Sequence, residues 1–125
     1  MNIQFFDTQQ SGDQIAMNGQ EVWSAGRTWR RADLTGKTEI HLAGYVTNVG
    51  GNGGTITLEY RADGSSAWLS TGASITVGAT DSEDMTGAVA TLPAGATTQV
   101  WLRLVAASGA TGDEVTFYAL QAIAA

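Results

Sequence analysis

The sequence predicts an all-β fold: one antiparallel β-sandwich, jelly-roll-like, with about eight strands, formed by residues 1–125 as a single domain. Stretches in which apolar and polar residues alternate recur along the chain, and this period of two is typical of strands. Sixteen glycines and a single proline separate them, as expected for many tight turns. The chain has no cysteine, so packing and strand pairing must hold the fold together.

In the first third of the chain, strands are expected at residues 3–7, 14–17, 20–23 and 27–31. The second and third of these flank Asn18-Gly19. Both residues of this dipeptide readily adopt the positive φ that a two-residue hairpin turn requires. The sequence therefore predicts a hairpin here, whose second strand continues towards residues 27–31.

The rest of the chain contains clearer alternation. Strands are expected at residues 39–47, 55–61, 85–92, 98–105 and 115–123; Trp68 and Leu69 open a further short strand, and Ile75 and Val77 mark another. The predicted core consists of inward-facing residues on three of them: Ile40, Leu42, Val46, Ile56, Leu58, Tyr60, Val100, Leu102 and Leu104. The last strand is apolar on both faces, which is typical of a strand that is central in its sheet or covered by another subunit.

The charge distribution argues against nucleic acid as a partner. The net charge is −6, and an acidic chain is a poor ligand for phosphate backbones. The one basic stretch contains Arg27, Arg30, Arg31 and Lys37 around Trp29. We interpret it as a solvated strand edge with Trp29 packed inward, although Trp29 could alternatively stack on a base.

No membrane association is expected either. No apolar run approaches the roughly 18 residues that a membrane-spanning helix needs. The first seven residues lack the basic and apolar segments of a secretory leader, so we expect no signal peptide.

The sequence offers little material for catalysis. His41 is the only histidine, and no Gly-x-Ser-x-Gly nucleophile elbow is present. Acidic residues cluster at Asp81, Glu83 and Asp84 and at Asp113-Glu114. We interpret these clusters as turn-forming residues, with a carboxylate pair for glycoside hydrolysis or a calcium site as alternatives. The sequence thus predicts a protein that is not an enzyme, with no catalytic residue, cofactor or metal.

The aromatic residues are the main candidates for a binding role. An exposed indole can stack on the apolar face of a sugar ring, but in small β domains tryptophan more often lies in the core or at a subunit interface. We expect two of the four tryptophans in the core and one at an interface. The candidate interface or ligand-stacking residues are Phe5, Phe6, Trp23, Trp29, Trp68, Trp101 and Tyr118.

Several turns and strand ends have the look of a known class of domain: Asp33-Leu34-Thr35-Gly36, Ile40–Tyr45, Leu58–Trp68, Leu92-Pro93-Ala94-Gly95, Val100–Val105 and Ser108–Asp113. In this pattern the chain resembles small jelly-roll domains of tailed bacteriophage virions, which are capsid decoration proteins or head and tail fibre modules. The same architecture is similar to carbohydrate-binding modules. No functional residue transfers individually from this resemblance.

The resemblance implies a virion structural protein that is made in the host cytoplasm. It would decorate the outer surface of the capsid and stabilise it by binding the major capsid protein, as a homo-oligomer for which a trimer is favoured. The alternative is a carbohydrate-binding module of a phage tail or fibre, with a glycan as its partner.

The two ends of the chain test this expectation. Ile3, Phe5 and Phe6 at the start, and the two-sided apolar strand 115–123 at the end, predict self-association or docking through the termini. The competing hypothesis is that residues 3–7 and 115–123 pair with each other inside one sandwich, which would bury them without a partner.

Overall fold

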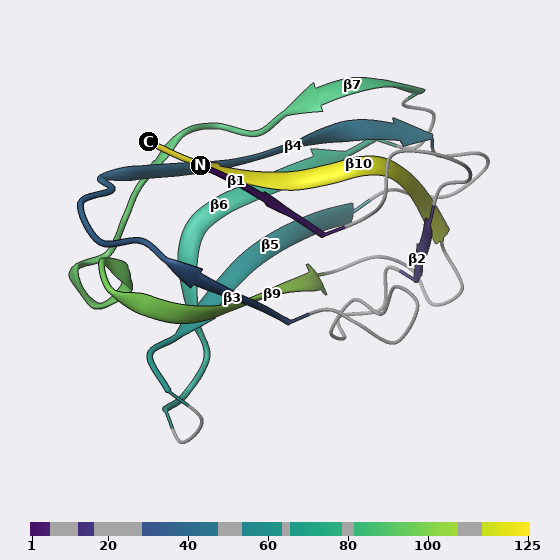
Figure 1. The fold of residues 1–125 in the computed structure, drawn as a ribbon. Coiled ribbons are helices and arrows are strands. Elements are labelled where there is room, and N and C mark those ends of the chain that lie inside the picture. The colour runs from purple at the N-terminus through teal and green to yellow at the C-terminus, as the bar shows by residue number, and fades with distance from the viewer. Residues whose placement is uncertain (6–12, 17–28, 48–53, 64–65, 79–81, 108–113) are drawn as a thin grey trace.

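Two antiparallel sheets face each other in the computed structural model (Figure 1). The structure describes residues 1–5, 13–16, 29–47, 54–63, 66–78, 82–107 and 114–125. The first sheet has the order β1 (Asn2–Gln4), β10 (Glu114–Ala124), β4 (Glu39–Thr47) and β7 (Ser82–Thr86); β2 (Asp13–Ala16) also pairs with β10, and β8 (Ala90–Thr91) with β4. The second sheet has the order β3 (Arg30–Asp33), β9 (Gln99–Ala107), β5 (Gly54–Arg61) and β6 (Leu69–Val77). The predicted jelly-roll-like sandwich is confirmed.

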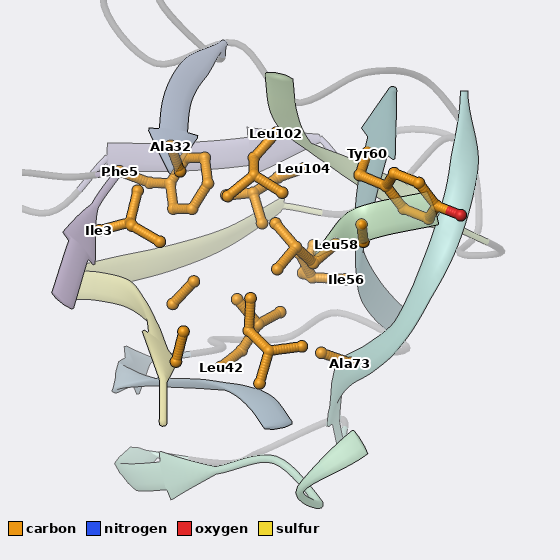
Figure 2. Packing of buried hydrophobic residues seen from close by; sticks show 14 of the residues in the cluster. Ile3, Phe5, Ala32, Leu42, Ile56, Leu58, Tyr60, Ala73, Leu102 and Leu104 are labelled. Atoms are coloured by element: carbon orange, nitrogen blue, oxygen red, sulfur yellow. The ribbon is translucent and has the colours of Figure 1, made fainter. Parts of the chain in front are cut away.

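The core lies between the inner faces of the two sheets. Leu42 of the first sheet belongs to one buried cluster with Leu58 and Leu104 of the second (Figure 2). Eight of the nine predicted core residues are buried, namely Ile40, Leu42, Ile56, Leu58, Tyr60, Val100, Leu102 and Leu104; the side chain of Val46 is outside the description. Alternation succeeds here because one face of each strand is buried, and a shift of one residue would turn the whole apolar set towards water.

Strand β6 joins two segments that the sequence predicts as separate strands, at residues 68–69 and 75–77. The register between β5 and β6 shifts between Thr57, which lies opposite Ser74, and Glu59, which lies opposite Ser70. Gly72 has a φ of 88°. The hydroxyl of Thr71 donates a hydrogen bond to the carbonyl oxygen of Leu58 (2.8 Å) and accepts one from the N–H of Ala73 (3.1 Å). This irregularity keeps the strand continuous, because the buried polar groups find partners within it.

Residues 85–92, expected to form one strand, are divided between β7 and β8. The N–H of Gly87 donates to the carbonyl oxygen of Leu42 (2.8 Å), and its Cα lies against the carbonyl of Ser74 on β6. The pairing of β7 with β4 therefore ends at this glycine, and the chain pairs with β4 again further on as β8.

The turn after β3 is organised by Asp33. One of its carboxylate oxygens accepts a hydrogen bond from the N–H of Thr35 (3.0 Å), and Gly36 has a φ of 79°. Hydrogen bonds from the side chain and then the backbone of Thr35 hold the pKa of Asp33 below its usual value. Asp and Gly thus have the turn roles that their chemistry favours.

The two ends of the chain pair with each other. Asn2, Ile3 and Gln4 lie opposite Ile123, Ala122 and Gln121, and β10 is central between β1 and β4 (Figure 1). Ile3 and Phe5 are buried in the core. The competing hypothesis for the termini therefore holds for the described residues, and the expectation that Phe5 serves an interface is corrected, because its side chain is only 4% exposed.

The predicted Asn18-Gly19 hairpin lies outside the described residues. Only its first strand overlaps them, as β2, which pairs with residues 114–117 at the start of β10.

Arg30 connects the two sheets at their shared edge. Its Nε donates to the carbonyl oxygen of Gln4 and its Nη2 to that of Phe5, both at 3.0 Å. Its guanidinium carbon is 5.7 Å from the centroid of the Phe5 ring. A planar, forked donor can reach both carbonyls at once, whereas an ammonium group cannot reproduce that geometry.

Arg30→Lys is expected to destabilise the domain by about 1–2 kcal/mol, because at least one partly buried carbonyl loses a charge-assisted hydrogen bond. Urea unfolding monitored by tryptophan fluorescence measures this loss. Lys37→Arg, an exchange of the same two residue types on a turn, should change the stability by less than about 0.5 kcal/mol. Equal effects of the two variants would show that Arg30 does not link the sheets.

Candidate functional site: the arginine–tryptophan face

The outer face of the second sheet brings arginine and tryptophan side chains together. Arg31 on β3 and Arg61 on β5 both lie opposite Trp101 on β9. Two residues further along β9, Arg103 lies opposite Glu59. These positions alternate with buried ones along each strand, so their side chains point away from the core.

Two further tryptophans, directly before strands β3 and β6, complete the cluster. The centroid of the Trp29 ring is 5.4 Å from that of Trp68, with an angle of 61° between the ring planes, and 6.1 Å from that of Trp101. Both separations are within the range of favourable aromatic contacts. We call Arg31, Arg61, Arg103, Trp29, Trp68 and Trp101 the arginine–tryptophan face.

Each of the three arginines lies beside an indole ring. The guanidinium carbon of Arg61 is 4.6 Å from the centroid of Trp29 and 4.7 Å from that of Trp68. The guanidinium carbon of Arg103 is 4.4 Å from the ring centroid of Trp68, and that of Arg31 is 5.3 Å from the ring centroid of Trp101. All four distances are short enough for cation–π attraction. These contacts limit the freedom of both the arginine and the tryptophan side chains.

One of the arginines is held by an acid. Arg103 binds Glu59 through Nη2 and Nε, at 2.7 and 2.8 Å from the same carboxylate oxygen. Both side chains are partly exposed, so this ion pair serves mainly to orient Arg103 rather than to stabilise the fold.

Arg61 is placed differently. Its Nε atom is buried, and no residue that the structure describes accepts a hydrogen bond from it. The outward positions of β3, β5 and β9 carry Arg31, Arg61 and Arg103 against Glu59 and Asp33, so this side has a small excess of positive charge in a protein whose net charge is −6.

The arrangement combines apolar rings with hydrogen-bond donors. Trp29 is 43% exposed, while Trp68 and Trp101 are half-buried. Indole rings present a flat apolar surface, and guanidinium groups donate in fixed directions around it. Such a surface can hold a small ring that is apolar on one face and carries hydroxyl or acidic groups at its edge.

Three of the predicted stacking residues, Trp29, Trp68 and Trp101, are thus brought together. Phe6 and Trp23 lie outside the described residues, as does the side chain of Tyr118. The prediction that Trp29 packs inward is wrong, and no described tryptophan is buried, although two of the four were expected in the core. Trp29 lies just outside a strand that buries Ala32 and exposes Arg31 and Asp33, and continuing this alternation backwards places Trp29 outward.

The arginines were not among the predicted site residues. A signal for them exists in the sequence, since the alternation of 55–61 and 98–105 predicts Glu59, Arg61, Trp101 and Arg103 to face outward. Their assembly into one site depends on the neighbours of β9, which alternation does not reveal.

The other polar candidates do not converge in the described part of the chain. His41 is half-buried on β4, and Glu83 and Asp84 are exposed on β7. Among the residues that the structure describes, no group of three or more His, Asp or Glu side chains is placed to hold a metal ion. Asp81 and Asp113 are outside the description. In the part of the chain that the structure describes, no helix is long and apolar enough to cross a membrane.

Solved structures share this fold at low sequence identity. The CBM36-1 domain, a carbohydrate-binding module of a multidomain xylanase from the hindgut metagenome of Trinervitermes trinervoides, aligns with a TM-score of 0.59 and 14% identity, over 100% of this chain and 97% of that one. The Eiger TNF of S. frugiperda aligns with a TM-score of 0.54 and 9% identity, over 99% and 90%. The CBM22-1–GH10 modules of Clostridium thermocellum xylanase 10B reach a TM-score of 0.49 at 12% identity, over 100% and 29%.

No family model matches the sequence, and no curated protein matches it. The likenesses to the CBM36-1 domain and to Eiger TNF show the antiparallel β-sandwich. They do not assign a function, since the same architecture serves a sugar-binding module and a TNF protein.

Proposed function

We propose that this domain is a carbohydrate-binding module that holds a glycan on the arginine–tryptophan face. The observation that supports the proposal is the cluster of Trp29, Trp68 and Trp101 on the outer face of one sheet, with ring centroids 5.4 and 6.1 Å apart around Trp29. Large aromatic side chains gathered on an outer face usually mark a binding surface.

The chemistry of this face suits a sugar. One side of a pyranose ring consists of C–H groups, which pack on the electron-rich face of an indole. The hydroxyls at the edge of the ring accept hydrogen bonds, and Arg31, Arg61 and Arg103 supply donors beside the indoles. The cation–π contacts hold these donors in place before the ligand arrives, which lowers the entropy cost of binding.

The fold agrees with this assignment. The CBM36-1 domain of the xylanase has the same sandwich architecture over nearly its whole length. The proposed activity is binding without catalysis. Glu59, the acid beside the indoles, is engaged by Arg103, whereas a canonical glycosidase site needs two carboxyl groups that act on the substrate.

Decoration of a phage capsid stays a prediction from the resemblance. The pairing of the two chain ends within one sandwich removes one of its motivations, because Ile3 and Phe5 are buried without a second subunit. The trimer and the capsid partner therefore have no structural feature of the described residues in their favour.

Trp29→Ala is expected to weaken glycan binding about tenfold, because the variant loses the most exposed stacking surface of the face. The measurement is an array of plant, bacterial and animal oligosaccharides, followed by calorimetric titration of the best ligand. Thermal unfolding should change little, since a side chain that is 43% exposed contributes little to the core.

Val89→Ala serves as the control. Val89 is 56% exposed and lies between β7 and β8, two strands of the first sheet, whereas the arginine–tryptophan face is on the second. Its affinity should equal that of the unmodified protein. Failure to bind any saccharide on the array would overturn the proposal. So would binding of single-stranded oligonucleotides that depends on Trp29, because the face would then stack on bases.

A further inference from the structure

We propose that the arginine–tryptophan face selects saccharides that carry a carboxylate, such as uronic or sialic acids; this inference rests on the proposed glycan binding. Its basis is the charge of the face rather than its aromatic rings. Of the three arginines on it, only Arg103 forms an ion pair with an acid among the residues that the structure describes.

Arg61 is the central cation of the face. Its guanidinium carbon is within 4.7 Å of the ring centroids of both Trp29 and Trp68, and its buried Nε has no hydrogen-bond acceptor in the described part of the chain. A positive charge beside apolar rings is poorly hydrated, so it gains more from an incoming anion than a fully solvated charge does.

Arg31 provides a second cation on the same face. It lies opposite Trp101, which in turn lies opposite Arg61. Its Nη2 donates a long hydrogen bond, 3.4 Å, to Oε1 of Gln99. Trp101 is thus flanked by guanidinium groups on both neighbouring strands.

A carboxylated sugar complements both halves of this surface. Its ring offers C–H groups to the indoles, and its carboxylate can accept two parallel hydrogen bonds from one guanidinium group, the strongest pairing that arginine makes. A long polyanion such as nucleic acid fits less well than a short acidic oligosaccharide, because the net charge of −6 on the whole protein repels the phosphates that extend outside this patch. The face therefore favours a ligand with a single acidic group per stacked ring.

The test compares chemically matched ligands on the intact protein. Trigalacturonate is paired with its methyl ester, and sialyllactose with lactose, so that the two pairs distinguish uronic from sialic acids. At least one acid should bind about tenfold more tightly than its neutral partner, and the difference should shrink as NaCl rises from about 0.05 to about 0.5 M.

Arg61→Gln should bring the affinity for the preferred acid close to that for its neutral partner. Lys37→Gln removes the same charge outside the face and should leave the preference intact. Thermal unfolding checks that both variants are folded. If Arg61→Gln does not fold, the matched ligands and the salt series on the unmodified protein still decide the question.

The outcomes separate the two proposals. Equal affinity for acidic and neutral partners overturns the charge selection and leaves glycan binding in place. Binding to neither member of any pair, and to nothing on the oligosaccharide array, overturns both. A preference for the acid that Arg61→Gln and Lys37→Gln reduce equally would reflect net charge rather than a site.

Discussion

Leu102→Ala is expected to cost roughly 2–5 kcal/mol of the free energy of unfolding. Leu102 is fully buried on β9, between β3 and β5, with Arg30 and Tyr60 as its cross-strand neighbours. Removing its branched end leaves a cavity that strands paired on both sides cannot easily close. Urea unfolding followed by both far-UV circular dichroism and tryptophan fluorescence measures the loss.

The same substitution at Leu69 is a matched control. Leu69 opens β6 and is 54% exposed, so Leu69→Ala should shift the stability by no more than about 0.5 kcal/mol. If both variants lose the same stability, the inner face of the second sheet is not the core that the buried leucines indicate.

Gly87→Ala is expected to destabilise the domain by about 3 kcal/mol or more. A Cβ atom at this position would fall on the carbonyl oxygen of Ser74. A backbone atom in a paired strand cannot move aside as the end of a side chain can, so either β6 or the β7–β8 connection must shift. The shift would also strain the hydrogen bond from Gly87 to Leu42. Thermal unfolding of the variant tests this expectation.

Gly36→Ala separates a steric clash from backbone strain. Gly36 has a φ of 79°, but a Cβ there would meet no atom within 4 Å. Its replacement should cost only the penalty of a left-handed conformation, about 1–2 kcal/mol. A larger loss at Gly36 than at Gly87 would mean that the close approach of Gly87 to Ser74 is absent from the folded protein.

The inner faces of the sandwich could be predicted because they depend on local alternation. Ile40 and Leu42, like Ile56 and Leu58, are separated by polar or small residues, so one register alone buries them. Strand ends were harder to predict. A glycine within a strand pattern suggests a bulge or a close approach, but the sequence does not tell which strands Gly72 and Gly87 meet.

The position of the last strand, β10, within its sheet could not be predicted from the sequence of that strand. A segment that is apolar on both faces suits the middle of a sheet and a subunit interface equally well. The structure favours the first, because β1 pairs with one edge of β10 and β4 with the other. The pairing of β1 with β10 joins residues more than a hundred positions apart, and composition does not encode it.

The arginines of the candidate site were missed for a related reason. The outward positions of Arg61 and Arg103 follow from alternation, but their meeting with Trp29 and Trp68 requires the strand order β3-β9-β5-β6. Trp29 was predicted inward because a large apolar ring favours burial. On β3, however, Ala32 occupies the inward position, and Trp29 packs against Arg61 and its two neighbouring indoles instead.

The paired chain ends and the arginine–tryptophan face lie on different sheets of the sandwich. The amino group of Met1 donates to the carbonyl oxygen of Ala124 (3.0 Å), and the N–H of Ala124 donates back to Met1 (2.9 Å), so both ends emerge side by side from the first sheet (Figure 1). The arginine–tryptophan face looks outward from the opposite sheet. Immobilising the protein on a bead or a sensor chip through either end would therefore attach it by the first sheet, which does not carry the arginine–tryptophan face.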